Sequence, residues 1–226
     1  GDCIESLQRI SNKPIQTIEV NVLGNANILE SSKINNIKQF LFASSIYIFS
    51  HLGSFYRCSK QSCENYIEEY GRQYNLNYNI MRYGSLYGPR SDQSNGVYRL
   101  IKKSIEKSKV LFQDDIRTIR EYINVHDAAE ASVDIINDHS FFNKAVMISG
   151  ETAIKSSELA KKVANYLNIE FVIADKSTDN EYRSSHYIDN PHTYEPPTTE
   201  KFPIKNQQSI DSNIFQLIED IKSQLK

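Results

Sequence analysis

The sequence predicts an α/β protein with a parallel central sheet, and two observations support this prediction. The chain has 226 residues, of which 39% are hydrophobic, so it can close a substantial core. Along the first third of the chain, amphipathic helical stretches alternate with short apolar runs. This alternation is typical of folds in which helices connect parallel strands, and the right-handedness of such connections leaves few other arrangements.

Two helix and strand pairs account for the first third of the chain. In the range 17–32 the apolar residues are spaced by four, four and three, which predicts one helical face made of Ile18, Val22, Ala26 and Leu29. The pattern then predicts a buried strand over 38–45, a helix over 56–73 that ends at Gly71 or shortly after it, and a strand over 77–84.

The rest of the chain alternates less regularly. Asp127 is a plausible N-cap for the helix that follows it. The range 178–206 is rich in Pro, Thr, Asn and charged residues, which predicts a loop. Elsewhere the pattern predicts helices over 97–107, 127–137, 156–167 and 210–225, and strands over 110–112, 121–125, 145–149 and 170–174.

Composition excludes several classes of protein. The net charge of −2 gives no general attraction to nucleic acid or to anionic lipid. The three cysteines are too few for a disulfide framework or a four-cysteine zinc site, and the five histidines show no metal-ligand spacing, so we expect no metal. The start of the chain has no signal peptide pattern, and no stretch is apolar enough to span a bilayer. We therefore expect a cytoplasmic protein.

The main candidate catalytic residues lie in the motif YRCSK, residues 56–60. Tyr56 and Lys60 are four residues apart, so a helix presents the phenol and the ammonium on one face. A nearby cation favours the phenolate, which makes Tyr56 a candidate general base. Ser44 or Ser45, at the end of the preceding strand, would lie at the edge of the sheet where α/β folds bind ligands. Cys58, within the same turn, is expected to be a small buried residue. Glu68 and Glu69 are expected to lie on a solvent-exposed face of the helix.

Five segments in the same order resemble the NAD-dependent epimerase/dehydratase family of the extended short-chain dehydrogenase/reductases. They are NVLGNANILE, QFLFASS, YRCSK, MRYGSLYGPR and REYINVHDAA. The resemblance implies a Rossmann-like sheet with a smaller C-terminal substrate-binding region. Residues 1–90 would belong to the dinucleotide-binding domain and 91–226 mainly to the substrate region, with 121–150 returning to the sheet.

The resemblance also implies roles for individual residues. Tyr56 would be the acid/base, Lys60 would hold the nicotinamide ribose, and Ser45, or else Ser44, would bind the reacting sugar hydroxyl. Asn21 matches an active-site asparagine of the family, although it is more often a structural residue in this kind of position. The cofactor and the sugar would be bordered by Tyr83, Gly84 and Ser85, and the nucleotide would be bound by Phe112, Arg120 and Arg183. Phe112 and its neighbours Val110 and Leu111 fit a core strand equally well.

Four departures from patterns found in the family affect this prediction. Ser85 stands where many relatives carry Asn, and the interval from Ser45 to Tyr56 is short. The eight glycines form no glycine-rich phosphate loop, so residues 1–226 look like the part of such an enzyme that follows the first half of the dinucleotide fold. Ile46 and Tyr47 replace the Asp-Glu pair of dehydratases.

The predicted function is that of an NAD- or NADP-dependent nucleotide-sugar epimerase or reductase, of a kind used in the biosynthesis of polysaccharides or cell-surface sugars. Its partners would be a nucleotide-diphosphate sugar and a second copy of the chain, joined through a four-helix bundle of the helices over 17–32 and 56–73, whose outward residues include Tyr66 and Tyr70. The alternatives are a catalytically silent fragment or binding module of the same fold, and a dehydratase. The sequence does not distinguish epimerase from reductase.

Overall fold

A computed structural model describes residues 13–50, 53–113, 116–173, 199–205 and 207–225. Its central sheet has four parallel strands in the order β1 (Phe40–Ser45), β2 (Tyr78–Tyr83), β7 (Lys144–Ile148) and β10 (Glu200–Lys201). The predicted α/β fold with a parallel sheet is therefore confirmed. In the part of the chain that the structure describes, β1 pairs only with β2 and lies at one end of the sheet.

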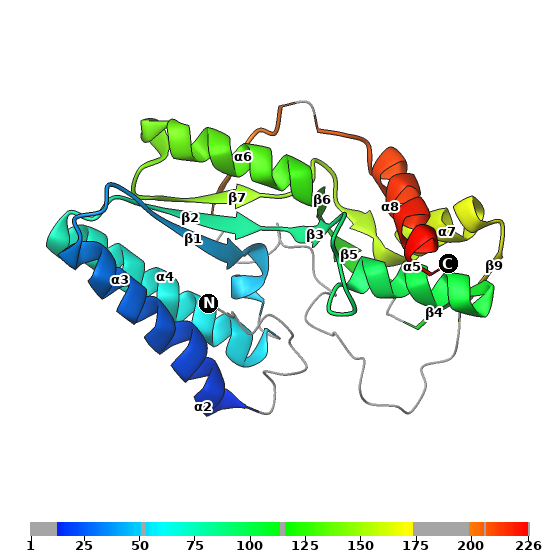
Figure 1. Cartoon of the computed structure of the whole chain (residues 1–226), viewed down its shortest axis with the longest axis horizontal. Helices are drawn as coiled ribbons and strands as arrows, with labels where there is room; N and C mark the ends of the chain where they lie inside the picture. The colour runs from blue at the N-terminus through cyan, green and yellow to red at the C-terminus, as the bar shows by residue number, and fades with distance from the viewer. Residues whose placement is uncertain (1–12, 51–52, 114–115, 174–198, 206, 226) are drawn as a thin grey trace.

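Helices cover both faces of this sheet (Figure 1). On one face lies α6 (Val125–Asn137), and on the other lie α2 (Pro14–Thr17), the π-helical segment η1 (Ile18–Leu23), α3 (Gly24–Ile34) and α4 (Ser54–Tyr74). Successive side chains of β2 point to opposite faces of the sheet, and this decides which helix layer each one contacts. Ile80 packs with side chains of α3 and α4, whereas Met81 packs with those of α6. By the same alternation Arg82 faces α4 and Tyr83 faces α6.

The first helix is continuous from Pro14 to Ile34 and contains a π-helical stretch. Its buried residues recur every four positions at Thr17, Asn21, Asn25 and Leu29, and Ser32 follows three positions later. In a pure α-helix a four-residue spacing drifts by about 40° per step, and the wider π turns take up this drift. The predicted apolar face is confirmed at Leu29 but wrong at Ile18, which is 53% exposed.

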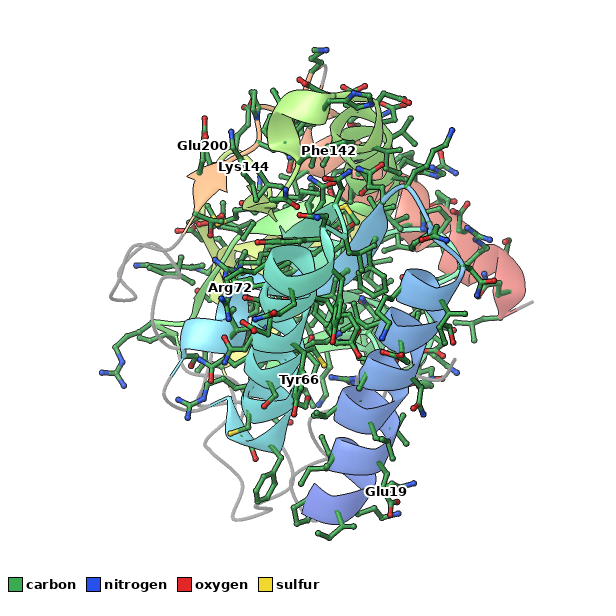
Figure 2. All side chains as sticks on the ribbon, turned by 90° about the vertical axis from the view of Figure 1, so that its left-hand side faces the viewer. Glu19, Tyr66, Arg72, Phe142, Lys144 and Glu200 are labelled. Carbon is green, nitrogen blue, oxygen red and sulfur yellow. The ribbon has the colours of Figure 1, made fainter. Side chains whose placement is uncertain are left out.

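The buried side of this helix is largely polar, while large apolar residues point outward. Figure 2 shows the helix beside α4, with Glu19 near its lower end and Tyr66 on α4. The outward apolar residues are Ile15, Ile18, Leu23, Ile28 and Ile34, each at least 53% exposed. The helix thus reverses the usual pattern, in which the apolar side faces the protein.

A second core lies beside the sheet and is built from helices with one small sheet (Figure 1). The elements are α5 (Gly96–Lys107), β4 (Lys109–Phe112), α7 (Ser156–Leu167), β9 (Glu170–Ile173) and α8 (Ile210–Gln224), and β4 pairs with β9 in parallel. Val110 and Phe112 pack there with residues of three helices, α5, α7 and α8. Short strands connect the two parts: β3 (Ser85–Tyr87) pairs with β6 (Tyr122–Asn124), and β5 (Ile119–Arg120) with β8 (Ile154–Lys155).

Most predicted helices and strands are confirmed to within a few residues, and three details are wrong. Asn124, not Asp127, caps α6, since its side chain accepts the His126 N–H. The range 178–206 was expected to be loop throughout, but Glu200–Lys201 is β10, and most of the range lies outside the described residues. The predicted end of α4, at Gly71 or shortly after it, is confirmed, since the helix ends at Tyr74 before the left-handed Asn75. Cys58 is exposed, because it lies on the outer side of α4, and Cys63 is the buried cysteine.

Candidate functional site

One face of α4 carries the predicted catalytic pair. Tyr56 and Lys60 are one turn apart, and the next turn brings Glu64 to the same face. The Lys60 Nζ donates to the Ala43 carbonyl oxygen at 2.8 Å, which joins the helix to β1. The same nitrogen lies 5.8 Å from the centre of the Tyr56 ring and 4.8 Å from that of Phe42. The ammonium is thus buried between a carbonyl oxygen and two aromatic rings.

The two serines that end β1 have different partners. The Ser44 hydroxyl donates to the Glu64 carboxylate on the α4 side of the sheet. The Ser45 Oγ accepts the Tyr47 N–H at 3.2 Å and caps the 3-10 helix η2 (Ile46–Phe49). Since Ser44 already binds a buried carboxylate, Ser45 is the better candidate for a ligand hydroxyl.

A buried ion pair lies directly behind these residues. The Arg82 Nη2 is 2.6 Å from the Glu64 Oε2, and its Nε donates to Oε1 at 3.2 Å. Both side chains are almost fully buried, and Arg82 also donates to Thr199 Oγ1 at 3.1 Å. We did not predict this pair, although an arginine in the apolar strand NIMRY and a glutamate four residues after Lys60 are signals for it.

The end of β2 lies next to the serines. Ser45 is in register with Tyr83, and Tyr83 with Ile148 of β7. The Tyr83 hydroxyl is 2.6 Å from Ser132 Oγ on α6, and burial raises the pKa of Tyr83 while this hydrogen bond opposes the rise. Tyr83 is therefore protonated at neutral pH. A Cβ on Gly84 would stand 2.6 Å from the Glu121 carbonyl oxygen, so the chain crossing here needs glycine.

Tyr47 lies across this edge of the sheet. Its ring is buried with Ile46 and with Met147 of β7, and its hydroxyl is 2.8 Å from Ser85 Oγ. Tyr47 thus links the turn after β1 to the turn after β2. From the sequence, Tyr47 marks only a departure from dehydratases, and its contact with Ser85 was not predicted.

Asn21 contacts α4 instead of pointing at Tyr56 directly. Its Nδ2 donates to Ser59 Oγ at 3.0 Å, and Ser59 donates in turn to the Tyr56 carbonyl oxygen at 2.8 Å. The Asn21 carbonyl oxygen accepts the Cys63 thiol at 3.3 Å. These contacts support the structural interpretation of Asn21.

The predicted nucleotide-binding residues are less close together. Arg120 is half-buried, with its Nε 3.4 Å from Ser156 Oγ. It precedes Glu121, whose carbonyl oxygen accepts the Ser85 N–H at 2.8 Å, so Arg120 is near the sheet edge. Phe112 is buried in the second core, 6.1 Å from Phe171 between ring centres. Arg183 lies outside the described residues.

Metal-ligand clusters and membrane-spanning helices are both absent from the described residues. In the described ranges, no three or more His, Cys, Asp or Glu side chains are grouped as metal ligands. No described helix combines the length and the apolar character that crossing a bilayer requires. A cavity of about 460 Å3 lies away from Tyr56, between α6 and the chain after β10, and is lined by Val133, Phe202, Ile204 and neighbouring residues.

Comparison with solved structures gives close matches to the fold. The crystal structure of the UDP-glucose 4-epimerase of Thermotoga maritima with UDP-glucose covers 100% of this chain and 77% of its own, with a TM-score of 0.83 and 19% identity. The UDP-glucose 4-epimerase of Thermus thermophilus, solved with NAD, covers 98% of this chain and 76% of its own, with a TM-score of 0.73 and 20% identity. At such identities the likeness establishes the fold alone.

Comparison of sequences gives the family. A Methanocaldococcus jannaschii protein named "Putative UDP-glucose 4-epimerase" is 33% identical over 143 residues, which are 55% of this chain and 46% of that protein. Protein CapI of Staphylococcus aureus is 25% identical over 145 residues, 58% of this chain and 43% of CapI. The chain thus spans less than half the length of the curated relatives it matches. The family model for NAD dependent epimerases and dehydratases matches residues 4–148. Because this match covers more than half of the sequence, the chain belongs to the NAD dependent epimerase/dehydratase family.

Proposed function

We propose that the protein is an NAD- or NADP-dependent nucleotide-sugar epimerase in which Tyr56 is the general acid/base. The observation that carries the proposal is the position of Lys60, whose buried ammonium is held at the end of β1 by the Ala43 carbonyl and lies 5.8 Å from the Tyr56 ring. An ammonium in this position favours the phenolate form of a neighbouring tyrosine.

In the proposed reaction, Ser45 and Tyr56 would have different roles. Ser45 would bind the sugar hydroxyl and orient it toward Tyr56, which takes its proton as the carbinol carbon is oxidised to a ketone. A nicotinamide bound beside Tyr56 would supply the hydride acceptor for this oxidation and the hydride donor for the reduction that follows. Tyr56 would then give its proton back to the carbinol oxygen. Return of the hydride to the opposite face of the sugar inverts the carbon and makes the reaction an epimerisation.

The described residues fit the ribose end of such a cofactor. Lys60 and Tyr56 offer a cation and a phenol at the carboxyl ends of parallel strands, where dinucleotides bind in folds of this type. No glycine-rich turn for the pyrophosphate occurs among the described glycines, which stand at 24, 53, 71, 84, 88, 96 and 150. We therefore assign only the nicotinamide ribose end to these residues, with Tyr83, Gly84 and Ser85 alongside.

The proposed substrate is a nucleotide-diphosphate sugar. UDP-glucose and UDP-glucuronate 4-epimerases are among the relatives and the solved structures that match. Arg120, close to the sheet edge, is the described arginine suited to the diphosphate. An epimerase is favoured over a dehydratase because Ile46 and Tyr47, which follow Ser45, bring no carboxylate for an elimination.

The decisive test replaces Tyr56 by Phe and measures turnover of UDP-sugars with NAD. Loss of a general acid/base typically costs between about 10²-fold and 10⁴-fold in rate, so Y56F should be at least about 100-fold slower. Tyr166→Phe is the matched control, because the Tyr166 hydroxyl donates to the Asp211 carbonyl oxygen in an exposed contact between α7 and α8. A Y56F protein that keeps more than about a tenth of the rate contradicts the proposal.

We also propose a homodimer joined by the first helix and α4. The proposal is supported by the row of exposed apolar residues on the first helix and by Tyr66, 50% exposed on α4 (Figure 2). Four helices that bury such residues together form a stable interface in many proteins. Ile18→Glu and Ile28→Glu should then convert a dimer to a monomer in light scattering, and a wild-type monomer at micromolar concentration would contradict the proposal.

The protein is further proposed to act in the cytoplasm. Cys58 is a free thiol exposed on α4, which suits a reducing compartment. Cell fractionation tests this, and recovery in an extracellular or periplasmic fraction would contradict it.

A further inference from the structure

The arrangement of charges on α4 raises a question about Lys60. Glu64 follows Lys60 by four residues, so the two side chains lie on neighbouring turns of one helix face. A lysine and a glutamate at this spacing ordinarily attract each other, and the attraction is stronger in a buried site than in water. Such a pair would draw the Lys60 ammonium toward Glu64 and cancel its charge at Tyr56.

The structure shows a different pairing. Arg82 of β2 binds the Glu64 carboxylate through two nitrogens, at 2.6 and 3.2 Å, and Ser44 donates a further hydrogen bond to the same carboxylate. The Lys60 ammonium is directed to the Ala43 carbonyl oxygen and to the Tyr56 and Phe42 rings. The two cations therefore occupy different places, one at the carboxylate and one at the phenol.

We propose that Arg82 is a positioning residue of the active site, which engages the Glu64 carboxylate so that the Lys60 ammonium stays directed at Tyr56; this inference rests on the proposed function. Arg82 suits this task, because its planar guanidinium binds both carboxylate oxygens at once and stays charged at every working pH. Its burial, with the side chain 8% exposed, protects the pair from screening by salt.

The other charged or titratable groups on the elements that pack against α4 have partners elsewhere or lie apart. Among the described residues, Glu30 pairs with Lys33 and with Tyr70 near the far end of α4, and Glu19 is exposed. The Tyr83 hydroxyl binds Ser132 on the opposite face of the sheet, that of Tyr47 binds Ser85, and the Tyr78 ring packs over Gly71. Arg82 is thus the described cation placed against Glu64.

The test compares the pH dependence of kcat/KM in the protein and in two variants. In Arg82→Met, the Glu64 carboxylate keeps only the Ser44 hydroxyl of the partners described above and can turn to Lys60, so the phenolate of Tyr56 is less favoured. We expect the ascending limb of the profile to move to higher pH by about one unit, which is about a tenfold loss of kcat/KM below the limb. In the double variant Glu64→Gln with Arg82→Met, no carboxylate competes for Lys60, and the limb should return to within about 0.3 unit of wild type.

A purely structural role for Arg82 predicts a different result. R82M would then have lower stability and lower activity, but the ascending limb of its pH profile would stay at the wild-type pH. That result would overturn the proposal. If R82M does not fold, Glu64→Gln tests the proposal alone. The ascending limb of its pH profile should lie at or below the wild-type pH, because no carboxylate is left to attract Lys60. A limb that moves up by about one pH unit in Glu64→Gln overturns the proposal. Lys162→Met is the control, since it breaks a 2.6 Å ion pair with Asp211 on the outer surface of α7 and α8 and should leave the limb unchanged.

A second measurement separates this inference from the proposed function. The ultraviolet absorbance of tyrosinate, taken as the difference between the protein and its Tyr56→Phe variant, titrates Tyr56 without any substrate. Its midpoint should rise in R82M and return in the double variant, and a midpoint that R82M leaves unchanged contradicts the proposal. If Y56F retains full turnover, the proposed function fails, while this titration still reports on Arg82.

Discussion

Asn21 and Asn25 offer a paired test of how the first helix is held against α4. Both amides are buried on the same face, one turn apart, each 7% exposed. The Asn21 Nδ2 donates to Ser59 Oγ at 3.0 Å, whereas the Asn25 Nδ2 has no hydrogen-bond partner among the described residues. A buried hydrogen bond contributes about 0.5–1.5 kcal/mol, and an unpaired buried donor costs about 1–3 kcal/mol. Truncation at the two sites should therefore differ in effect.

Asn21→Ala should lower the free energy of unfolding by about 1–2 kcal/mol, from the lost hydrogen bond and the lost contacts of the amide. Asn25→Ala should cost less, and Asn25→Leu should be neutral or stabilising, because it removes the unpaired donor and fills its space. Urea unfolding followed by circular dichroism measures all three. Equal losses at the two positions would refute the reasoning. A drop in kcat above about 100-fold in N21A, with stability intact, would instead make Asn21 a catalytic residue.

Three further predictions concern other parts of the molecule. Gly150→Ala should destabilise the protein by about 1–3 kcal/mol or more, because its Cβ would stand 2.0 Å from the Tyr122 carbonyl oxygen; an unchanged Tm would contradict this. Burial raises the pKa of Asp127, so the folded protein binds this proton more tightly than the unfolded chain, and stability is lost as the pH rises above about 4. Asp127→Asn should therefore be more favourable, relative to wild type, at pH 7 than at pH 4 in denaturant unfolding, and the opposite order would show that the sign is wrong. In the native protein, maleimide should label the exposed Cys58 well before Cys63, which is 1% exposed, as peptide mapping can show.

The sheet and the placement of Tyr56 and Lys60 on one helix face were predictable from the sequence because both depend on local patterns. The apolar runs that became β1 and β2 have the length and composition of buried strands, and the four-residue spacing of Tyr56 and Lys60 places them on one helix face wherever the helix packs. These signals need no knowledge of distant contacts.

Contacts between residues far apart in the sequence were not predictable in the same way. The partners of Glu64 come from β1 and β2, and Tyr47 reaches Ser85, 38 residues away. The outward position of Ile18 follows from a π-helical stretch that hydrophobic spacing does not reveal, because an α-helical period was assumed. Strand β10 has two residues, too few for a periodic pattern, and it forms because β7 offers a free edge.

The π-helical stretch also has a consequence for how the chain tolerates insertion and deletion. Each residue of an α-helix turns the chain by about 100°, and each residue of the wider π-helical turns rotates it by less, so deleting one residue within Ile18–Leu23 would let an α-helix form there with nearly the same total rotation. Thr17 would then stay on the buried side of the helix, and Ile15 on its outer side. A single deletion should therefore be tolerated within this stretch, whereas a deletion in the α-helical part, Gly24–Ile34, should rotate the preceding residues by about 100° relative to α4.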